Sequence, residues 1–217
     1  AHNSLAIKDP VGAMGALEPL TRMHPDHPEY PYLMGVAQLQ VAGVGLAVES
    51  LEESMRLDPN RPLTMIALGF AYNAQKKFDL AKEILNRSLV LVPEEVEALA
   101  ALAEAEEGVG EIEQAESHAE RALAQAPTHH AALYVLGKVR MSQGRFEEAR
   151  DLFLRAVATS PDSPKAQYQL SLAYARLGDQ ESSNKHRQLY REAKDAEDER
   201  IIDMRTRAGM SVGGMKL

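Results

Sequence analysis

Histidine and glutamate are the residue types in this chain whose spacing could serve chemistry. His24 and His27 flank Asp26 in a proline-rich stretch, and His129 directly precedes His130. A helical zinc site places two histidines one turn apart, and thiolates complete many such sites. Neither histidine pair has this spacing, and the chain has no cysteine. We therefore interpret these histidines as polar loop residues and expect no metal and no cofactor.

The glutamates are concentrated in residues 96–129, which contain eight of them and one arginine, a net charge of −7. Glu97, Glu104 and Glu107 are spaced by seven and three residues, so they share one face of a helix. A face of this charge favours a partner segment with basic residues. The alternatives are that the carboxylates are only solvated, or that Lys138 pairs with Glu104.

No combination of these residues indicates catalysis. The sequence shows no nucleophile paired with a base, no phosphate-binding glycine loop and no metal signature. The glutamates are expected on a surface open to water, where nothing would tune a carboxyl group for proton transfer. The net charge of the whole chain, −8, disfavours nucleic acid, whose phosphates need a basic face. We expect neither enzyme activity nor nucleic-acid binding.

The elements that must position these side chains recur with a fixed period. Small residues and prolines return at one constant interval in three series: Gly35, Gly69, Ala103, Gly137 and Ser171; Ala47, Ala81, Ala115, Ala149 and Ser183; Pro25, Pro59, Pro93, Pro127 and Pro161. The interval is 34 residues. A period of this size predicts a stack of small structural units, which usually provides an extended surface rather than one central core.

Each unit has the pattern of two helices. In residues 62–95, apolar residues lie three and four apart before and after Lys76, and Pro93 ends the second run. Gly69 and Ala81 are expected where the two helices approach most closely. The chain lacks tryptophan and has few β-branched runs, which also favours helix over strand. No run approaches the ~20 apolar residues needed to span a bilayer.

These residues resemble the tetratricopeptide repeat, whose pattern is W-x2-L-G-x2-Y…A-x3-F…P. In residues 130–163 the tyrosine is replaced by Arg140, and the remaining pattern is matched by Leu136, Gly137, Ala149, Phe153, Ala156 and Pro161. The leading tryptophan is absent throughout, and its place is taken by Pro31, Met65, Leu99, Leu133 and Gln167. The resemblance implies an all-α fold, a right-handed superhelical solenoid of antiparallel helix pairs.

The resemblance divides the chain into three parts. Residues 1–27 hold a half repeat whose helix, weakened by Pro19, is the second of a pair; this suggests a chain cut from a longer one. Residues 28–197 hold five repeats: 28–61, 62–95, 96–129, 130–163 and 164–197. Residues 198–217 hold the end of a long helix and a glycine-rich tail. Because no proline or glycine occurs from Gln180 to Arg207, one unbroken helix is predicted there, which caps the last repeat or docks on a partner.

In this family the first helices of the pairs line a concave groove, and the resemblance assigns groove residues by their position in the repeat. The assigned residues are Tyr32, Val36, Leu39, Ile66, Phe70, Asn73, Glu97, Glu104, Glu107, Tyr134, Lys138, Met141, Tyr168 and Leu172, with Ser142 and Arg176 at further groove positions. The apolar members before residue 71 predict an exposed patch that binds an amphipathic helix or extended segment, unless the N-terminal helix covers it.

The predicted function is a non-catalytic scaffold that binds a partner peptide or helix, with basic residues where the partner meets the glutamates. Two alternatives stay open: a structural unit that self-associates, and an accessory domain of a larger secretion or envelope protein or enzyme. The composition, rich in alanine, leucine and arginine, suggests a bacterial source. A soluble protein of the cytoplasm or periplasm is expected.

Overall fold

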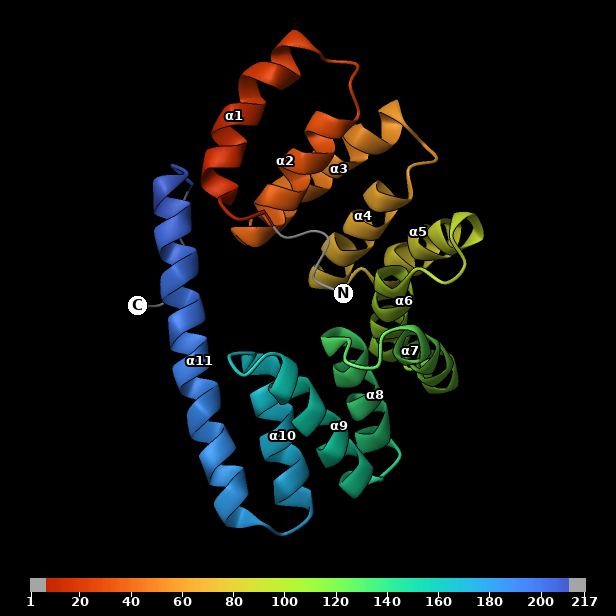
Figure 1. Ribbon diagram of the computed structural model, residues 1–217, viewed down its shortest axis with the longest axis vertical. Helices are drawn as coiled ribbons and strands as arrows, with labels where there is room; N and C mark the ends of the chain where they lie inside the picture. Colours follow the sequence, from red (N-terminus) through yellow and green to blue (C-terminus); the bar gives the residue numbers. More distant parts are fainter. Residues whose placement is uncertain (1–6, 211–217) are drawn as a thin grey trace. The chain divides into compact units, whose positions relative to one another are not determined.

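The computed structural model describes residues 7–210, which form eleven α-helices (Figure 1). Within these residues there is no strand, so the predicted all-α fold is confirmed. The helices are α1 Pro10–Met23, α2 Glu29–Gln40, α3 Val44–Leu57, α4 Pro62–Ala74, α5 Phe78–Leu91, α6 Val96–Val109, α7 Ile112–Gln125, α8 His130–Ser142, α9 Phe146–Thr159, α10 Pro164–Arg176 and α11 Gln180–Arg207.

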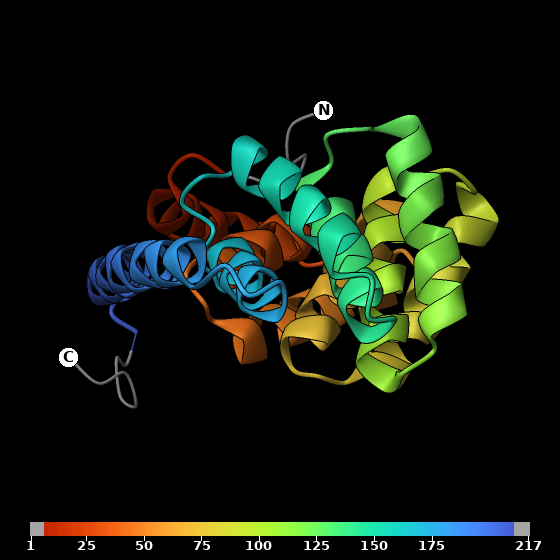
Figure 2. The ribbon, with the colours of Figure 1, turned by 90° about the horizontal axis from the view of Figure 1, so that it is seen from below.

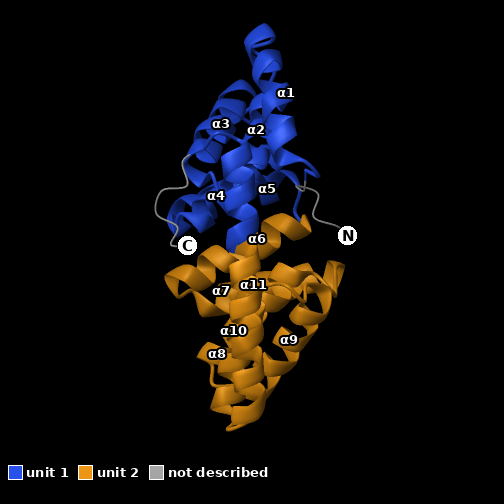
Figure 3. Cartoon of the chain, turned by 90° about the vertical axis from the view of Figure 1, so that its left-hand side faces the viewer, with its two compact units in different colours: residues 1–93, 198–217 blue, residues 94–197 orange. Residues whose placement is uncertain are grey.

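The chain divides into two compact units (Figure 3). Unit 1 comprises residues 1–93 and 198–217, and unit 2 comprises residues 94–197. In unit 1, α1 packs on α2, α2 on α3 and α4 on α5; in unit 2, α6 packs on α7, α8 on α9 and α9 on α10. Figure 2 shows the same helices seen from below. The long C-terminal helix is confirmed, and it has 28 residues.

The first helices of unit 2 form a layer of their own. Helix α8 contacts both α6 and α10, the first helices of the neighbouring pairs, and it also packs on α7 and α9. Ridges of side chains from one helix pack into the grooves of the next, which lets neighbouring pairs stack without a central core.

The turn between the two helices of each pair depends on one residue with a left-handed backbone. Gly110, Gly144 and Gly178 have φ of 84°, 74° and 81° at this place. At the same repeat position, one and two repeats before Gly110, stand Lys76 with φ 58° and Ala42 with φ 55°. A side chain with a Cβ is strained in this region, whereas glycine is not. The first two turns therefore keep their conformation against a local cost.

Close approach within the pairs depends on the periodic small residues. A Cβ added to Gly69 would lie 2.6 Å from Cγ of Leu85, and Gly35 and Gly137 face Leu51 and Phe153 in the same way. Leu85 and Phe153 are fully buried. The large side chain on the second helix thus fills the space that glycine leaves on the first, which is the packing role predicted for Gly69.

The N-terminal helix α1 runs without interruption through Pro19. Asp9 caps it, since its carboxylate accepts a hydrogen bond of 3.1 Å from the backbone N–H of Gly12. Arg207, the last residue of α11, lies 3.6 Å from the same Asp9. Both groups are more than half exposed, so this ion pair contributes little to stability.

Candidate functional site

The predicted apolar groove residues of unit 1 lie mostly in the interior. Tyr32, Val36 and Ile66 are 5%, 3% and 2% exposed. The guanidinium of Arg61 lies 4.6 Å above the Tyr32 ring and also forms an ion pair with Glu29. Side chains that are this well covered cannot touch a partner without a local rearrangement. The expectation of an exposed apolar patch here is therefore wrong.

The other three predicted residues of unit 1 are also covered to a large extent. Leu39 on α2 and Phe70 on α4 are half-buried, and Asn73 is 7% exposed. In the described part of unit 1, the apolar residues of the first helices thus serve mainly as core. Their sequence pattern could not show this, because core and groove positions both favour apolar side chains.

The three glutamates predicted on α6 are half-buried, and two of them have partners within unit 2. Oε2 of Glu97 lies 3.3 Å from Nε2 of His129. Lys138 forms its ion pair with Glu107 and not with Glu104, which corrects the sequence expectation. Glu104 has no ion pair among the described residues. Of the three carboxylates on this face, the chain thus neutralises Glu107 with Lys138 and places His129 beside Glu97.

The predicted residues on α8 and α10 remain accessible to different degrees. Tyr168 is 43% exposed, and its ring centroid lies 5.2 Å from that of Tyr190. Leu172 and Tyr134 are half-buried. Burial raises the pKa of Tyr134 to about 12, although a hydrogen bond with the side chain of Gln169 acts in the opposite direction. These residues give α8 and α10 a surface with aromatic and apolar character.

A pocket of about 440 Å³ opens on this surface between α8, the turn that follows it, and α10. Its walls include two predicted residues, Lys138 and Met141, and the two further groove positions, Ser142 and Arg176; Phe146 and Gln169 complete it, with Gly144 in the turn. The sequence reasoning did not select Phe146 or Gln169. Phe146 begins the second helix of its pair, and only the turn at Gly144 carries it to the edge of the first-helix surface.

The two basic residues of this pocket differ in their environment. Lys138 is neutralised by Glu107 and lies 6.0 Å from the centre of the Tyr134 ring. The guanidinium of Arg176 lies 5.9 Å from the centre of the Phe146 ring, and no carboxylate of the described residues pairs with it. Arg176 is also exposed. The pocket therefore combines an apolar wall with one unsatisfied positive charge.

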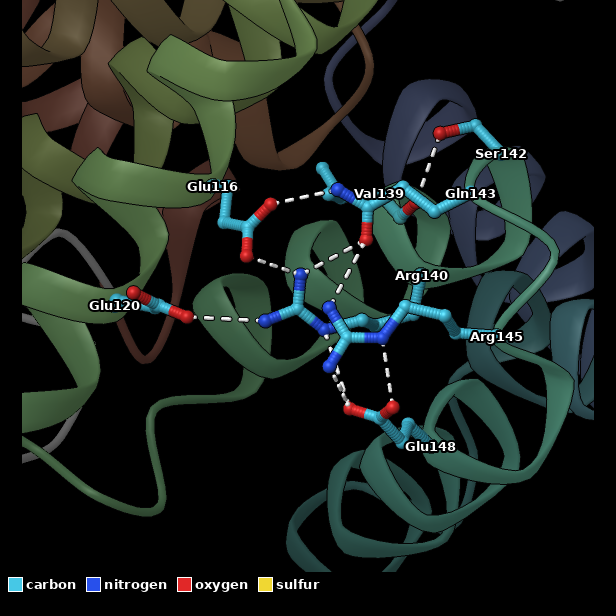
Figure 4. A network of polar contacts seen from close by, with 8 residues as sticks. All are labelled: Glu116, Glu120, Val139, Arg140, Ser142, Gln143, Arg145 and Glu148. Atoms are coloured by element: carbon cyan, nitrogen blue, oxygen red, sulfur yellow. Dashed lines mark hydrogen bonds and ion pairs between the residues drawn. The ribbon is translucent and has the colours of Figure 1, made fainter.

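A second charged cluster in unit 2 is satisfied within the chain. Arg140, which replaces the tyrosine of the repeat pattern, has a side chain only 7% exposed. Its guanidinium lies 2.5 Å from Glu116, 3.0 Å from Glu120 and 3.5 Å from Glu148. Figure 4 shows the side chain pointing toward these carboxylates. In unit 1, the hydroxyl of Tyr72 donates to Glu52 at 2.9 Å, again to a carboxylate 20 residues earlier. Arg140 thus pairs with three carboxylates, whereas Tyr72 at the equivalent position contacts one.

Glu116 shows how strongly this cluster favours ionised carboxylates. Burial alone would raise its pKa, but hydrogen bonds from Gln143 and Arg140 hold the pKa of Glu116 below its usual value. The Gln143 bond measures 2.7 Å. Because Arg140 and the carboxylates around it form ion pairs with one another, we interpret the cluster as structural.

A pocket of about 370 Å³ in unit 1 lies between α1, α2 and α3. Two of its rim carboxylates are already paired, Glu18 with Arg22 and Glu53 with Arg56. All four side chains are largely exposed, so the pairs are weak, and a third carboxylate at this rim, Glu49, adds a negative charge.

Within residues 7–210, no three histidine, aspartate or glutamate side chains come together in a way that could hold a metal ion. No helix of the same residues has the length and apolar character needed to cross a membrane.

Comparisons with known proteins agree with the helix pairs. The sequence profile of the tetratricopeptide repeat matches residues 100–164 and 134–196. Among curated proteins, no sequence matches this chain. The fold is similar to that of TTC0263, a tetratricopeptide protein of Thermus thermophilus, with a TM-score of 0.68 and 20% identity over 84% of this chain and 97% of that one.

Two further solved structures share the fold. YrrB, described as a tetratricopeptide protein with an unusual peptide-binding site, has a TM-score of 0.56 and 15% identity over 89% of this chain and 94% of its own. MamA of Desulfovibrio magneticus RS-1, from residue 41 to its end, has a TM-score of 0.58 and 20% identity over 78% and 96%. The profile match shows tetratricopeptide repeats in residues 100–164 and 134–196, and the solved structures show that the chain has the fold of tetratricopeptide proteins, which are in general protein-interaction scaffolds.

Proposed function

We propose that this chain is a non-catalytic scaffold that binds an extended peptide or an amphipathic helix on the surface of α8 and α10 at which the pocket of about 440 Å³ opens. The observation that carries this proposal is the pocket at Met141 and Arg176, together with the exposure of Tyr168 on the same helix as Arg176. Exposed aromatic and arginine side chains around an apolar pocket are the features of a protein-binding surface. The division of residues 28–197 into five repeats is part of the same proposal.

The proposed site is smaller than the groove predicted from the sequence. Tyr32, Val36 and Ile66 are excluded by their burial, and Glu97 and Glu107 by their partners within the chain. YrrB supports peptide binding by analogy, since its description names a peptide-binding site on the same fold. The family's general lack of catalysis supports the non-catalytic part of the proposal.

Position-specific photo-crosslinking in cells of the source organism tests this function. A photoreactive phenylalanine analogue replaces Tyr168, which is 43% exposed on α10, or Leu154, which is 39% exposed on α9. The two positions are matched in exposure but lie on different helix layers. We expect a discrete crosslinked partner from position 168 only. Equal crosslinking at both positions, or crosslinking at position 154 alone, would contradict the proposed surface.

Self-association is a second candidate function, favoured by one exposed apolar run. Val90, Leu91 and Val92 at the end of α5 are 81%, 45% and 38% exposed. Light scattering over a range of concentrations measures the mass of the chain, with Val90→Lys as the variant. A monomer at all concentrations removes this candidate, and a dimer that Val90→Lys dissociates supports it.

A further inference from the structure

The pocket on α8 and α10 has one positive charge that the chain does not neutralise. Lys138 on its rim is paired with Glu107, but Arg176 has no carboxylate partner among the described residues. An arginine fork donates two parallel hydrogen bonds to a carboxylate, a geometry that lysine cannot provide. The chemistry of the rim therefore selects a carboxylate rather than a basic group.

The phenyl ring of Phe146 holds the Arg176 guanidinium in place. Their separation of 5.9 Å is within the range of a cation–π contact. Such a contact restricts the rotamers of a long side chain before any partner arrives, so less conformational entropy is lost on binding. The exposed charge is thus partly preorganised beside an apolar surface.

The apolar wall of the pocket is anchored on the core of unit 2. Met141 packs against a buried cluster that includes Phe153 and Leu170. Its flexible thioether side chain can adapt to apolar groups of different shape. The neighbouring polar group, Gln169, is engaged with the hydroxyl of Tyr134, and the Ser142 hydroxyl donates to the carbonyl of Val139 at 2.7 Å. The wall therefore offers mainly apolar contact.

No equivalent charge occurs at the same place in the other repeats. At the repeat position of Arg176, counting back one repeat at a time, stand Ser142, Gly108, Ala74 and Gln40. The repeat architecture places each of these residues near the end of a first helix. The combination of a free guanidinium with an aromatic wall thus belongs to one place in the array.

We infer that this pocket binds an acidic segment of a partner protein, in which an apolar side chain inserts between Met141 and Phe146 while a neighbouring Asp or Glu pairs with Arg176. This inference rests on the proposed function and names the chemistry of its partner. It reverses the basic partner expected from Glu97, Glu104 and Glu107. The net charge of −8 repels an acidic segment at long range, but salt screens this beyond about 8 Å.

The test uses the full chain and three synthetic decapeptides, each acetylated and amidated, labelled with a fluorophore. In the first, leucine alternates with aspartate and glutamate; in the second, asparagine and glutamine replace the acids; in the third, lysine replaces them. A fourth peptide has neutral side chains and a free α-carboxylate. Fluorescence anisotropy measures the affinity of each. We expect the first peptide to bind most tightly.

Arg176→Glu should weaken binding of the acidic peptide by roughly tenfold or more, because one charge-assisted pair becomes a repulsion. Arg176→Lys should weaken it less, since the charge stays and the fork is lost. The matched control is Arg191→Glu, an exposed arginine on α11 with the same change in charge. It should leave the affinity unchanged. Circular dichroism confirms that each variant is folded.

Four outcomes of the peptide experiment overturn the inference. They are equal or tighter binding of the neutral or lysine peptide, binding only of the free α-carboxylate, no effect of Arg176→Glu, and an equal effect of Arg191→Glu. Loss of self-association in Arg176→Glu without any peptide would assign the pocket to a second copy instead, and also overturns it. The proposed function is judged separately, by the crosslinks at position 168, so a wrong partner chemistry does not remove the surface.

Discussion

Arg140 and Arg176 are both arginines of the first-helix layer in unit 2, and they have opposite environments. Arg140 is buried among Glu116, Glu120 and Glu148, whereas Arg176 is exposed beside an aromatic ring without a carboxylate. A buried charge must be paired within the chain, because burial of an isolated charge is strongly unfavourable. An exposed charge that the chain leaves unpaired is available to a partner. Residue type and helix therefore do not determine the role of an arginine here; its neighbours do.

The acidic residues of α6 follow the same distinction. Glu107 and Glu97 have basic neighbours on the next pair of helices, so their charge is used within unit 2. Glu104 is the one of the three without an ion pair in the described residues. The ion pairs that form in the folded chain thus remove part of the surface charge that the sequence predicts.

Arg140→Ala should give the largest loss of stability, about 2–3 kcal/mol, because it leaves carboxylates without their partner. The estimate is below that for a fully buried pair, since Glu120 is 54% exposed. Urea unfolding followed by circular dichroism measures the loss. Arg140→Tyr, which restores the tyrosine of the repeat pattern, is the control and should cost less. An unchanged unfolding midpoint for Arg140→Ala would show that the cluster is not structural.

Acid should weaken the same cluster, because protonation removes the charge of its carboxylates. The pKa of Glu116 is held below its ordinary value of 4.5, so its ionised form stabilises the folded state above that pH. This stability is lost as the pH falls below 4.5 and through the lowered pKa of the folded state. The difference in unfolding midpoint between the wild type and Glu116→Gln, measured from pH 7 to pH 3, should therefore shrink. A constant difference would contradict this.

Lys76→Gly removes a positive charge at a place where the backbone matters more than the charge. Its φ of 58° is strained for a residue with a Cβ, so glycine should stabilise the protein by about 1 kcal/mol. Gly110→Ala, at the equivalent turn, is the matched control and should destabilise by a similar amount. Thermal melts of both variants check the signs. Destabilisation by Lys76→Gly would show that the side chain has an unrecognised role.

Arg176→Glu should have the smallest effect on stability, within about 0.5 kcal/mol, because an exposed residue without an ion pair contributes little to the fold. Urea unfolding of this variant, side by side with Arg140→Ala, tests the comparison directly. A loss as large as that of Arg140→Ala would mean that Arg176 is structural, and the contrast between the two arginines would disappear.

Much of the fold could be predicted from the sequence. The constant repeat period, the glycines that allow close helix approach, and the proline-free stretch behind α11 all act within one helix or one pair. Such local signals survive in the sequence because each requires a particular residue at a particular spacing. The turn residues Ala42 and Lys76 are the exception, since nothing in their type indicates a left-handed backbone.

The candidate site could be predicted only in part. Met141, Lys138 and Tyr168 were selected by their position in the repeat, but Phe146 and Gln169 were not. The burial of Tyr32 and the pairing of Lys138 with Glu107 could not be predicted from the sequence either. By itself the sequence determined the helices, their pairing and their order, because these depend on local spacing. Only the tertiary structure decided which side chains are covered and which charges are paired, because both depend on neighbours from other helices.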